Sequence, residues 1–191
     1  MKKEAGFMGS NHLTNDSGQS LVEVIVAATV GIIVVVALTF ATIFSLRNAN
    51  FAQTSAQATK LAQEGIERVK TGRDRNSSIT GNFSISGQSI GSWSDNNLWT
   101  NEISPNCIPN CYFNINPSGE LQYLTAAPSI PSNAELIDKF QRVVVLSDNS
   151  SLLPDGITPS YKIQKTVTVI VTWTDTTGPH ESRLATILRK L

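Results

Sequence analysis

Residues 21–46 read LVEVIVAATVGIIVVVALTFATIFSL, and this stretch decides the fold of the chain. It contains 26 residues and a single ionisable side chain, that of Glu23. About 20 apolar residues in a helix are enough to cross the roughly 30 Å hydrocarbon core of a bilayer. The sequence therefore predicts a helix that is inserted in a membrane at some stage.

The stretch in front of this helix is polar and differs from a secretory signal. Residues 1–18 are rich in small and polar side chains, with Lys2 and Lys3 near the start. A secretory signal has its apolar core before the cleavage site, and that core is shorter than a membrane span. If a piece is removed from this chain, we expect it to be the polar piece 1–18.

The helical pattern continues after the span, but on one face only. Ala and Gln dominate residues 47–71, and Gly72 stands where a helix is expected to end. We therefore expect one nearly continuous helix over 20–71, apolar all round in its first half and amphipathic in its second. The apolar residues that recur at helical spacing in the second half are Phe51, Ala58, Leu61, Ala62, Ile66 and Val69.

The middle of the chain predicts loops and brief strands. Ser, Asn, Gly and Pro are frequent over 73–132, with short apolar bursts at 82–85 and 121–124. Four aromatic residues interrupt this polar stretch, and anchoring of a core is the role expected for them, with a binding patch as the alternative. They are Trp93, Trp99, Tyr112 and Phe113.

The last third predicts an antiparallel sheet with one apolar face. Strands are expected at 141–148, 161–175 and 183–191, with a turn at 177–179 between the last two. The second strand alternates, and its apolar face needs a cover, for which the amphipathic half of the helix is the candidate. The residues expected on that face are Ile163, Val167, Val169, Val171 and Trp173.

The composition argues against several functions. The chain has 15 Lys and Arg against 15 Asp and Glu, so no basic excess favours nucleic acid as a partner. Beyond residue 18, His180 is the only histidine, and it lies beside a Gly-Pro turn without a nucleophile motif, which indicates an exposed loop residue and no enzyme. Asp148, Asn149 and Asp155 could bind calcium, but their spacing does not match a calcium loop.

The two cysteines lie beyond the predicted span. Cys107 and Cys111 are four residues apart, which favours a local disulfide if this part of the chain is exported. Two free thiols are the alternative. A metal site is not expected, because zinc takes four ligands and no second Cys/His pair accompanies these two.

The run 18–24, GQSLVEV, leads directly into the apolar helix. It resembles the cleavage and methylation signal of type IV prepilins and the related pseudopilins, and this resemblance is specific over about 30 residues. In that family a membrane-embedded aspartyl peptidase cuts after the Gly and N-methylates the residue that follows. The resemblance implies a cut after Gly18, methylation of Gln19, and a role in filament assembly for Glu23, the fifth residue of the mature chain.

The resemblance also implies an α+β fold of the type IV pilin-like kind. Its long N-terminal helix would protrude with its membrane-spanning half and pack with its second half on a small antiparallel β-sheet. The expected parts are a leader 1–18, a transmembrane and filament-core helix 19–46, its amphipathic continuation 47–72 and an extracytoplasmic β-rich domain 73–191. No cofactor and no metal are expected.

The implied function is that of a structural subunit of a type IV pilus or related filament. Gln19 stands where Phe is frequent, Ser17 replaces a basic residue, and the span has no Pro, which favours a minor subunit. The implied partners are other pilin subunits, the prepilin peptidase, an inner-membrane assembly platform and, before assembly, the lipid bilayer. The chain would cross the cytoplasmic membrane once, with its N-terminus in the cytoplasm, and then enter a periplasmic or cell-surface filament.

Two alternatives remain at this stage. A pseudopilin of a type II secretion system would share the same processing and assembly. A membrane-anchored extracytoplasmic binding module would not assemble at all. The mass of the mature N-terminal peptide separates the module from the two filament subunits.

Overall fold

A computed structural model describes the backbone of residues 16–148, 151–152, 154, 156–157 and 159–191, and the side chains of these residues except 16–20 and 161. The expected leader 1–18 therefore lies almost entirely outside the described residues, as do Asn149 and Asp155 of the calcium alternative. The chain divides into two units, Met1–Phe51 and Ala52–Leu191. Helix α1 (Asp16–Asp74) contributes residues to both units.

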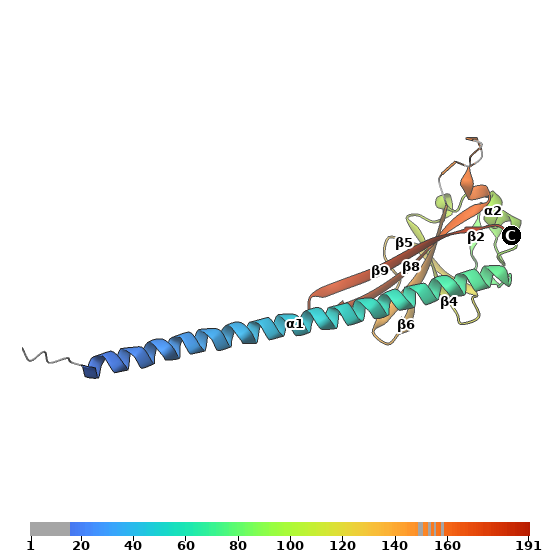
Figure 1. The fold of residues 1–191 in the computed structure, drawn as a ribbon. Helices are drawn as coiled ribbons and strands as arrows, with labels where there is room; N and C mark the ends of the chain where they lie inside the picture. Colours follow the sequence, from blue (N-terminus) through green and yellow to red (C-terminus); the bar gives the residue numbers. More distant parts are fainter. Residues whose placement is uncertain (1–15, 149–150, 153, 155, 158) are drawn as a thin grey trace, which may run out of the picture. The chain divides into compact units, whose positions relative to one another are not determined.

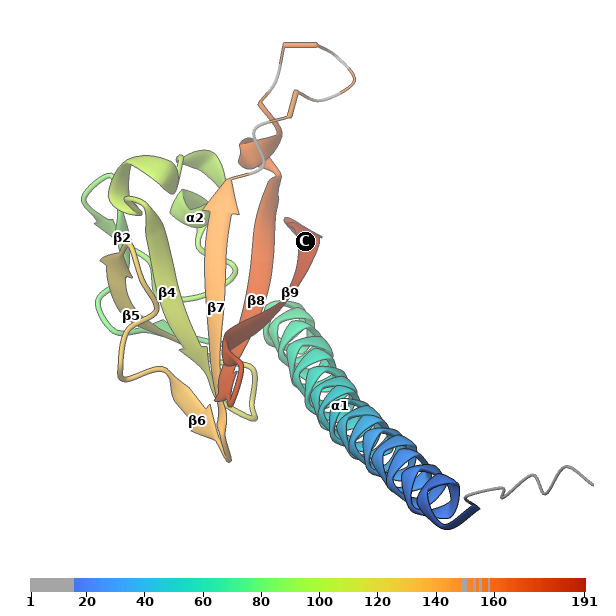
Figure 2. The same cartoon turned by 90° about the vertical axis from the view of Figure 1, so that its left-hand side faces the viewer.

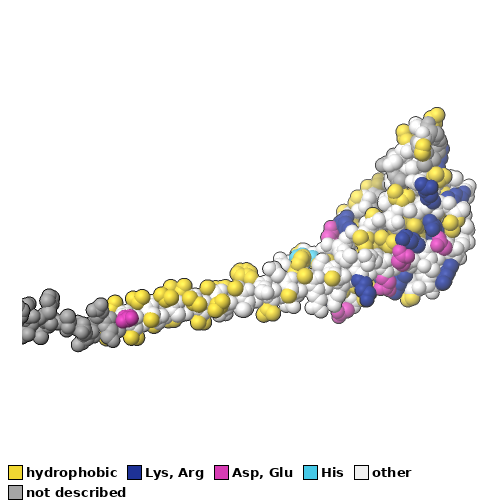
Figure 3. All heavy atoms as spheres, viewed as in Figure 1, with side chains coloured by type: hydrophobic (Ala, Val, Ile, Leu, Met, Phe, Trp, Pro, Cys, Tyr) yellow, Lys and Arg dark blue, Asp and Glu magenta, His cyan; other side chains and the backbone are white. Residues whose placement is uncertain are grey.

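In the first unit, the described residues form a helix without a core of its own. Residues 21–50 are all exposed, and apolar side chains cover the surface of this helical segment (Figure 3). Within the described residues, α1 is the one helix that is long and apolar enough to cross a membrane, judged by length and composition. The prediction of a long apolar N-terminal helix is confirmed.

The end of α1 differs from the prediction. Residues Gly72 and Asp74 are still helical, and the chain turns at Asn76, which has a φ of 53°. The N–H of Ser77 donates to the carbonyl of Gly72 (2.8 Å) and that of Asn76 to the carbonyl of Arg73 (3.0 Å), the pattern of a Schellman cap. Asn tolerates the left-handed conformation better than other non-glycine residues, so Asn76 and not Gly72 ends the helix.

The second unit is built around a seven-stranded sheet with the strand order β1-β5-β4-β7-β8-β9, and β6 also pairs with β7 (Figures 1 and 2). All its strand pairs are antiparallel except β1 with β5. The strands are β1 (Ile79–Thr80), β4 (Asn110–Ile115), β5 (Leu121–Ala127), β6 (Glu135–Ile137), β7 (Phe140–Asp148), β8 (Gln164–Asp175) and β9 (Gly178–Arg189).

Smaller elements lie beside this sheet. Strands β2 (Ser84–Ile85) and β3 (Gln88–Ser89) form a short hairpin, followed by helix α2 (Asn96–Thr100). Two 3-10 turns, η1 (Ser104–Asn106) and η2 (Ser160–Lys162), precede β4 and β8. The α+β architecture with an antiparallel sheet is therefore confirmed in outline.

Two strand boundaries were wrong. The strand expected at 161–175 begins at Gln164, because η2 occupies its first residues. The closing strand begins at Gly178 and not at 183, because Thr176 and Thr177 suffice for a two-residue hairpin loop and the pairing starts at Asp175 with Gly178.

The main core lies between the last part of α1 and one face of the sheet. From α1 it contains Ala58, Ala62, Ile66 and Val69, all at most 8% exposed. From β8 it contains Val167, Val169, Val171 and Trp173, as the alternation predicts. Ile163 does not belong to this face; it follows η2 and is 38% exposed. The predicted packing of the amphipathic segment on the sheet is thus confirmed within residues 52–191.

The opposite face of the sheet is not wholly bare, which corrects the expectation of a one-sided sheet. A smaller cluster contains Tyr112, Ala134, Val143, Val145 and Ile170, with Ile130 packed against it. The segment that follows β5 covers this part of the sheet. Trp93, Trp99 and Phe113 lie in the main core and Tyr112 in the smaller one, so the predicted anchoring role of the four aromatic residues is confirmed.

Candidate functional site

The N-terminal part of α1 carries the residues that the sequence singles out for processing and assembly. Gly18 and Gln19 are helical in their backbone, and the side chain of Gln19 lies outside the described part. Glu23 is exposed on α1. No other described residue forms a hydrogen bond or ion pair with it. From residue 24 to 46 the chain has no further ionisable side chain, so Glu23 is an isolated carboxylate on an apolar helix.

A membrane would make this carboxylate costly. Translocon-insertion scales assign about 2.5–3.5 kcal/mol to a charged residue at a helix centre and less near an interface. Ionisable residues in such segments commonly have a partner of opposite charge. A single chain offers Glu23 no such partner among its described residues, so the partner would have to come from elsewhere.

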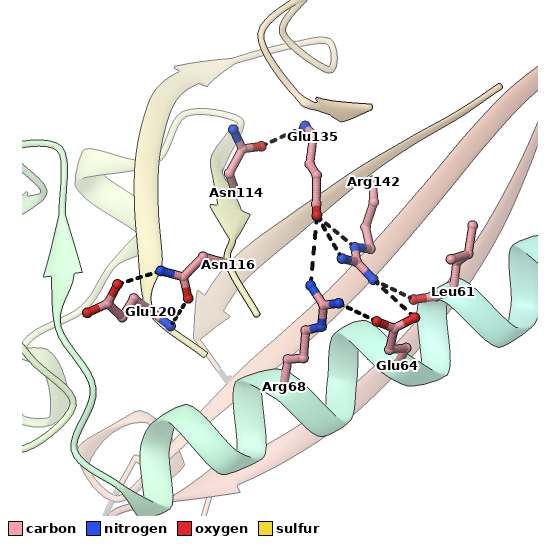
Figure 4. Close-up of polar contacts among 8 residues, drawn as sticks. All are labelled: Leu61, Glu64, Arg68, Asn114, Asn116, Glu120, Glu135 and Arg142. Carbon is pink, nitrogen blue, oxygen red and sulfur yellow. Dashed lines mark hydrogen bonds and ion pairs between the residues drawn. The ribbon is translucent and has the colours of Figure 1, made fainter. Parts of the chain in front are cut away.

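A second group of charged residues lies between α1 and the sheet (Figure 4). The guanidinium of Arg142, on β7, is completely buried and forms a two-bond fork with the carboxylate of Glu135, on β6, with both bonds 2.9 Å long. Its third nitrogen donates to the carbonyl of Leu61 in α1 (3.2 Å) and lies 3.9 Å from Glu64. Arg68 joins Glu64 to Glu135.

This network fixes the position of α1 on the sheet. Gly65 lies in the same contact: a Cβ built on it would stand 2.8 Å from Val169 and 3.4 Å from Arg142. The absence of a side chain at this position lets α1 approach β8 closely, which explains a glycine inside a helix. Sequence reasoning missed Arg142, although a lone arginine in an apolar strand is a usable signal for a buried partner.

The third group lies at the other end of β7. Lys165 is fully buried, and its Nζ is 2.6 Å from Oδ1 of Asp148 and 2.9 Å from the carbonyl of Asn101. Oδ2 of Asp148 accepts hydrogen bonds from the backbone N–H groups of Ile103 and Ser104 and from the Ser104 hydroxyl. These contacts occupy both carboxylate oxygens of Asp148, the one residue of the calcium alternative that is described.

Cys107 and Cys111 are joined in a disulfide, with 4.8 Å between their Cα atoms. Both residues are buried and belong to the main core. Ile108, between them, is 73% exposed and precedes a cis proline. The bridge therefore fixes the turn that leads from η1 into β4.

His180 is a half-buried residue of β9, opposite Trp173 of β8, which corrects the expectation of an exposed loop residue. Its ring stacks on Trp173, with 5.4 Å between centroids, and its Nε2 is 3.0 Å from Asp175 and 2.9 Å from the Thr177 hydroxyl. Hydrogen bonds from the hydroxyl and then the backbone N–H of Thr177 lower the pKa of Asp175 to about 2. These contacts assign His180 to the structure of the turn.

An open hollow of about 710 Å³ lies beside this turn, lined by residues of β6, β7, β8 and β9, among them Leu136, Gln141 and Trp173. The indole N–H of Trp173 is buried and has no acceptor among the described residues. The described residues contain no group of three His, Cys, Asp or Glu side chains that could hold a metal ion.

Comparison with models of protein families, with curated proteins and with solved structures finds no match to this chain.

Proposed function

We propose that this chain is a filament subunit of the type IV pilin-like kind, most similar in its features to a minor subunit. It would be made with a leader, cut after Gly18, methylated on Gln19 and assembled through α1. The observation that carries this proposal is the isolated carboxylate of Glu23, five residues after the expected cut and at the start of an exposed apolar helix.

A filament would resolve two problems of the first unit together. Residues 21–46 expose apolar side chains whose contact with water is unfavourable, and a bundle of such helices would bury them against one another. The new N-terminal amine of a neighbouring subunit would supply the positive partner of Glu23, and N-methylation would keep that charge. Pairing inside the bundle would then favour one axial register of neighbouring helices.

The second unit supports this proposal by its construction. The Arg142 network, Gly65 and the core residues of α1 hold residues 52–74 against the sheet. A helix that carries an assembly segment at one end needs such an attachment, because a weak contact would let the domain separate from it. The same construction is compatible with a pseudopilin, which shares the processing and the assembly.

The processing step tests the proposal. The full chain is co-expressed with a prepilin peptidase, and the mass of the mature N-terminal peptide is measured. The expected result is a chain that begins at Gln19 and carries one additional methyl group. Gly18→Val is expected to block shortening, whereas the control Gly9→Val, inside the leader, should be processed normally.

Two results would overturn the proposal. One is a full-length chain after co-expression, which would favour a membrane-anchored binding module that never assembles. The other is normal shortening of the Gly18→Val precursor, because the cut would then not depend on the residue before Gln19.

A further inference from the structure

Asp148 and Lys165 lie directly opposite each other in the ladder between β7 and β8. Lys165 is completely buried, and the side chain of Asp148 is 8% exposed. Nζ of Lys165 is 2.6 Å from Oδ1 of Asp148. An amine and a carboxyl group are therefore held in contact, away from water, by the sheet itself.

Burial disfavours the positive charge that the Lys165 ammonium carries in water. Burial lowers the pKa of the Lys165 ammonium, and the hydrogen bond and negative charge of Asp148, followed by the charge of Glu102, act in the opposite direction. An ion pair taken out of water loses hydration energy that its mutual attraction only partly restores. Transfer of one proton from Nζ to Oδ1 across the 2.6 Å contact gives a neutral amine and a neutral acid.

The second carboxyl oxygen is surrounded by donors. The backbone N–H groups of Ile103 and Ser104 donate to Oδ2 at 2.8 and 3.0 Å, and the Ser104 hydroxyl donates at 3.0 Å. Backbone N–H groups aimed at one carbonyl oxygen stabilise the negative charge that develops on it when a nucleophile attacks the carbon. The described contacts of Asp148 thus resemble an oxyanion hole for addition to its Cγ.

We propose that Lys165 and Asp148 condense to an intramolecular isopeptide bond. The bond that forms joins Nζ to Cγ, and the bond that breaks joins Cγ to Oδ1. Oδ1 leaves as water with two protons from Nζ, one transferred before the attack and one as the tetrahedral intermediate collapses. An ammonium and a carboxylate are converted into one neutral amide and one water, so no oxidant, reductant or further reactant is needed.

The product would keep the hydrogen bonds of the site. Its remaining N–H has the Asn101 carbonyl as acceptor, at 2.9 Å from Nζ. Its carbonyl oxygen, the former Oδ2, retains Ile103 and Ser104 as donors. The buried charges disappear while their hydrogen-bonding partners remain satisfied, which favours condensation over a persistent ion pair.

Intact-mass measurement of the purified full chain, reduced so that the disulfide does not contribute, tests the cross-link. The expected mass is lower than that of the sequence by one water molecule. Digestion with trypsin should give the peptide 143–162 joined to 163–183, because trypsin does not cut after an acylated Lys165. The control Lys165→Arg keeps a positive charge but cannot form the bond, so it should show its full sequence mass.

The wild-type measurement decides the proposal even if Lys165→Arg fails to fold. A wild-type chain at its full sequence mass, with ordinary cleavage after Lys165, would show a simple ion pair and overturn the proposal. A water loss that peptide mapping places elsewhere in the chain would overturn it equally.

Discussion

Gly72 of α1 and Gly119 of the turn between β4 and β5 touch backbone to backbone. A Cβ built on Gly72 would stand 2.0 Å from the carbonyl oxygen of Gly119, and one built on Gly119 would stand 2.8 Å from the Cα of Gly72. Gly119 also has a φ of 84°, which disfavours any side chain. The last turn of α1 can therefore reach this part of the sheet only because both residues are glycine.

Replacement of Gly72 by Ala should destabilise the folded chain. The new methyl group meets backbone and not a movable side chain, so α1 or the turn must shift, at a cost of about 1–3 kcal/mol typical of overpacking. Because the new Cβ would stand 2.0 Å from a backbone oxygen, the cost should lie in the upper part of this range, above the roughly 1 kcal/mol that Ala gains over Gly in a helix. Urea unfolding followed by circular dichroism measures the difference.

Gly91→Ala is the matched control for this experiment. A Cβ at Gly91 meets nothing within 4 Å, and this glycine does not have a positive φ. Its free energy of unfolding should change by no more than about 0.5 kcal/mol. Equal stability of Gly72→Ala and Gly91→Ala would contradict the close contact between Gly72 and Gly119.

The ion pair between Arg142 and Glu135 should affect the free energy of unfolding mainly when one of the two partners is removed. Glu135→Gln removes the carboxylate that forms both bonds of the fork and leaves the fully buried Arg142 only the longer ion pair with Glu64, so about 3 kcal/mol of unfolding free energy should be lost. The double variant Arg142→Met, Glu135→Leu removes both charges and should recover much of this loss. Urea unfolding of Arg142→Met, of Glu135→Leu and of the double variant gives the coupling energy.

An exposed pair of the same chemistry provides the comparison. Arg183 and Glu181 on β9 are 59% and 48% exposed in their side chains. Arg183→Met should change the free energy of unfolding by at most about 1 kcal/mol, because water screens this pair. A loss at Glu135→Gln no larger than that at Arg183→Met would show that the buried fork does not fix α1 on the sheet.

Reduction of the disulfide should have a modest effect. The bridge joins residues with a sequence separation of 4, so it restricts the unfolded chain less than the 15-residue loop for which about 3 kcal/mol is expected. The urea midpoint of the wild type should fall slightly with a reductant, while that of a Cys107→Ser, Cys111→Ser variant should not respond. Two thiols alkylated in non-reduced, denatured mature protein would exclude the bond.

Local periodicity was sufficient to predict the long helix and the face of β8 on which it packs. The alternation over 167–173 places Val167, Val169 and Val171 on one face because side chains alternate strictly along a strand. The apolar stripe of 58–69 likewise predicts the face of α1 that packs on them. Both predictions depend only on residues that are close in sequence.

What the sequence did not predict depends on residues that are far apart in it. Gly72 suggested a helix end, but a glycine is needed there because the backbone of Gly119, in a distant turn, lies against it. The helix is ended instead by Asn76, which adopts the left-handed conformation. The buried Arg142 has Glu135 on β6 and Leu61 on α1 as partners, which no local pattern connects. In the sequence, Asp148 has other oxygen ligands as neighbours and was therefore considered for calcium. Its actual partner, Lys165, lies on the next strand and is distant in sequence.

The last prediction concerns Glu23, and it rests on the proposed filament. Glu23→Ala makes the span more apolar, so insertion in the membrane, cleavage after Gly18 and folding of the second unit should all persist. Assembly should suffer, because the N-terminal amine of a neighbour would enter the helix bundle without a partner, and an unpaired buried charge is strongly unfavourable. The measurement is the ratio of protein in sheared filaments to protein in the membrane pool, which should fall several-fold. Val24→Ala, at the next position of the same exposed helix, is the control and should assemble like the wild type. Equal ratios for Glu23→Ala and Val24→Ala, with cleavage intact in both, would refute the role of the carboxylate in assembly while leaving the processing of the chain unaffected.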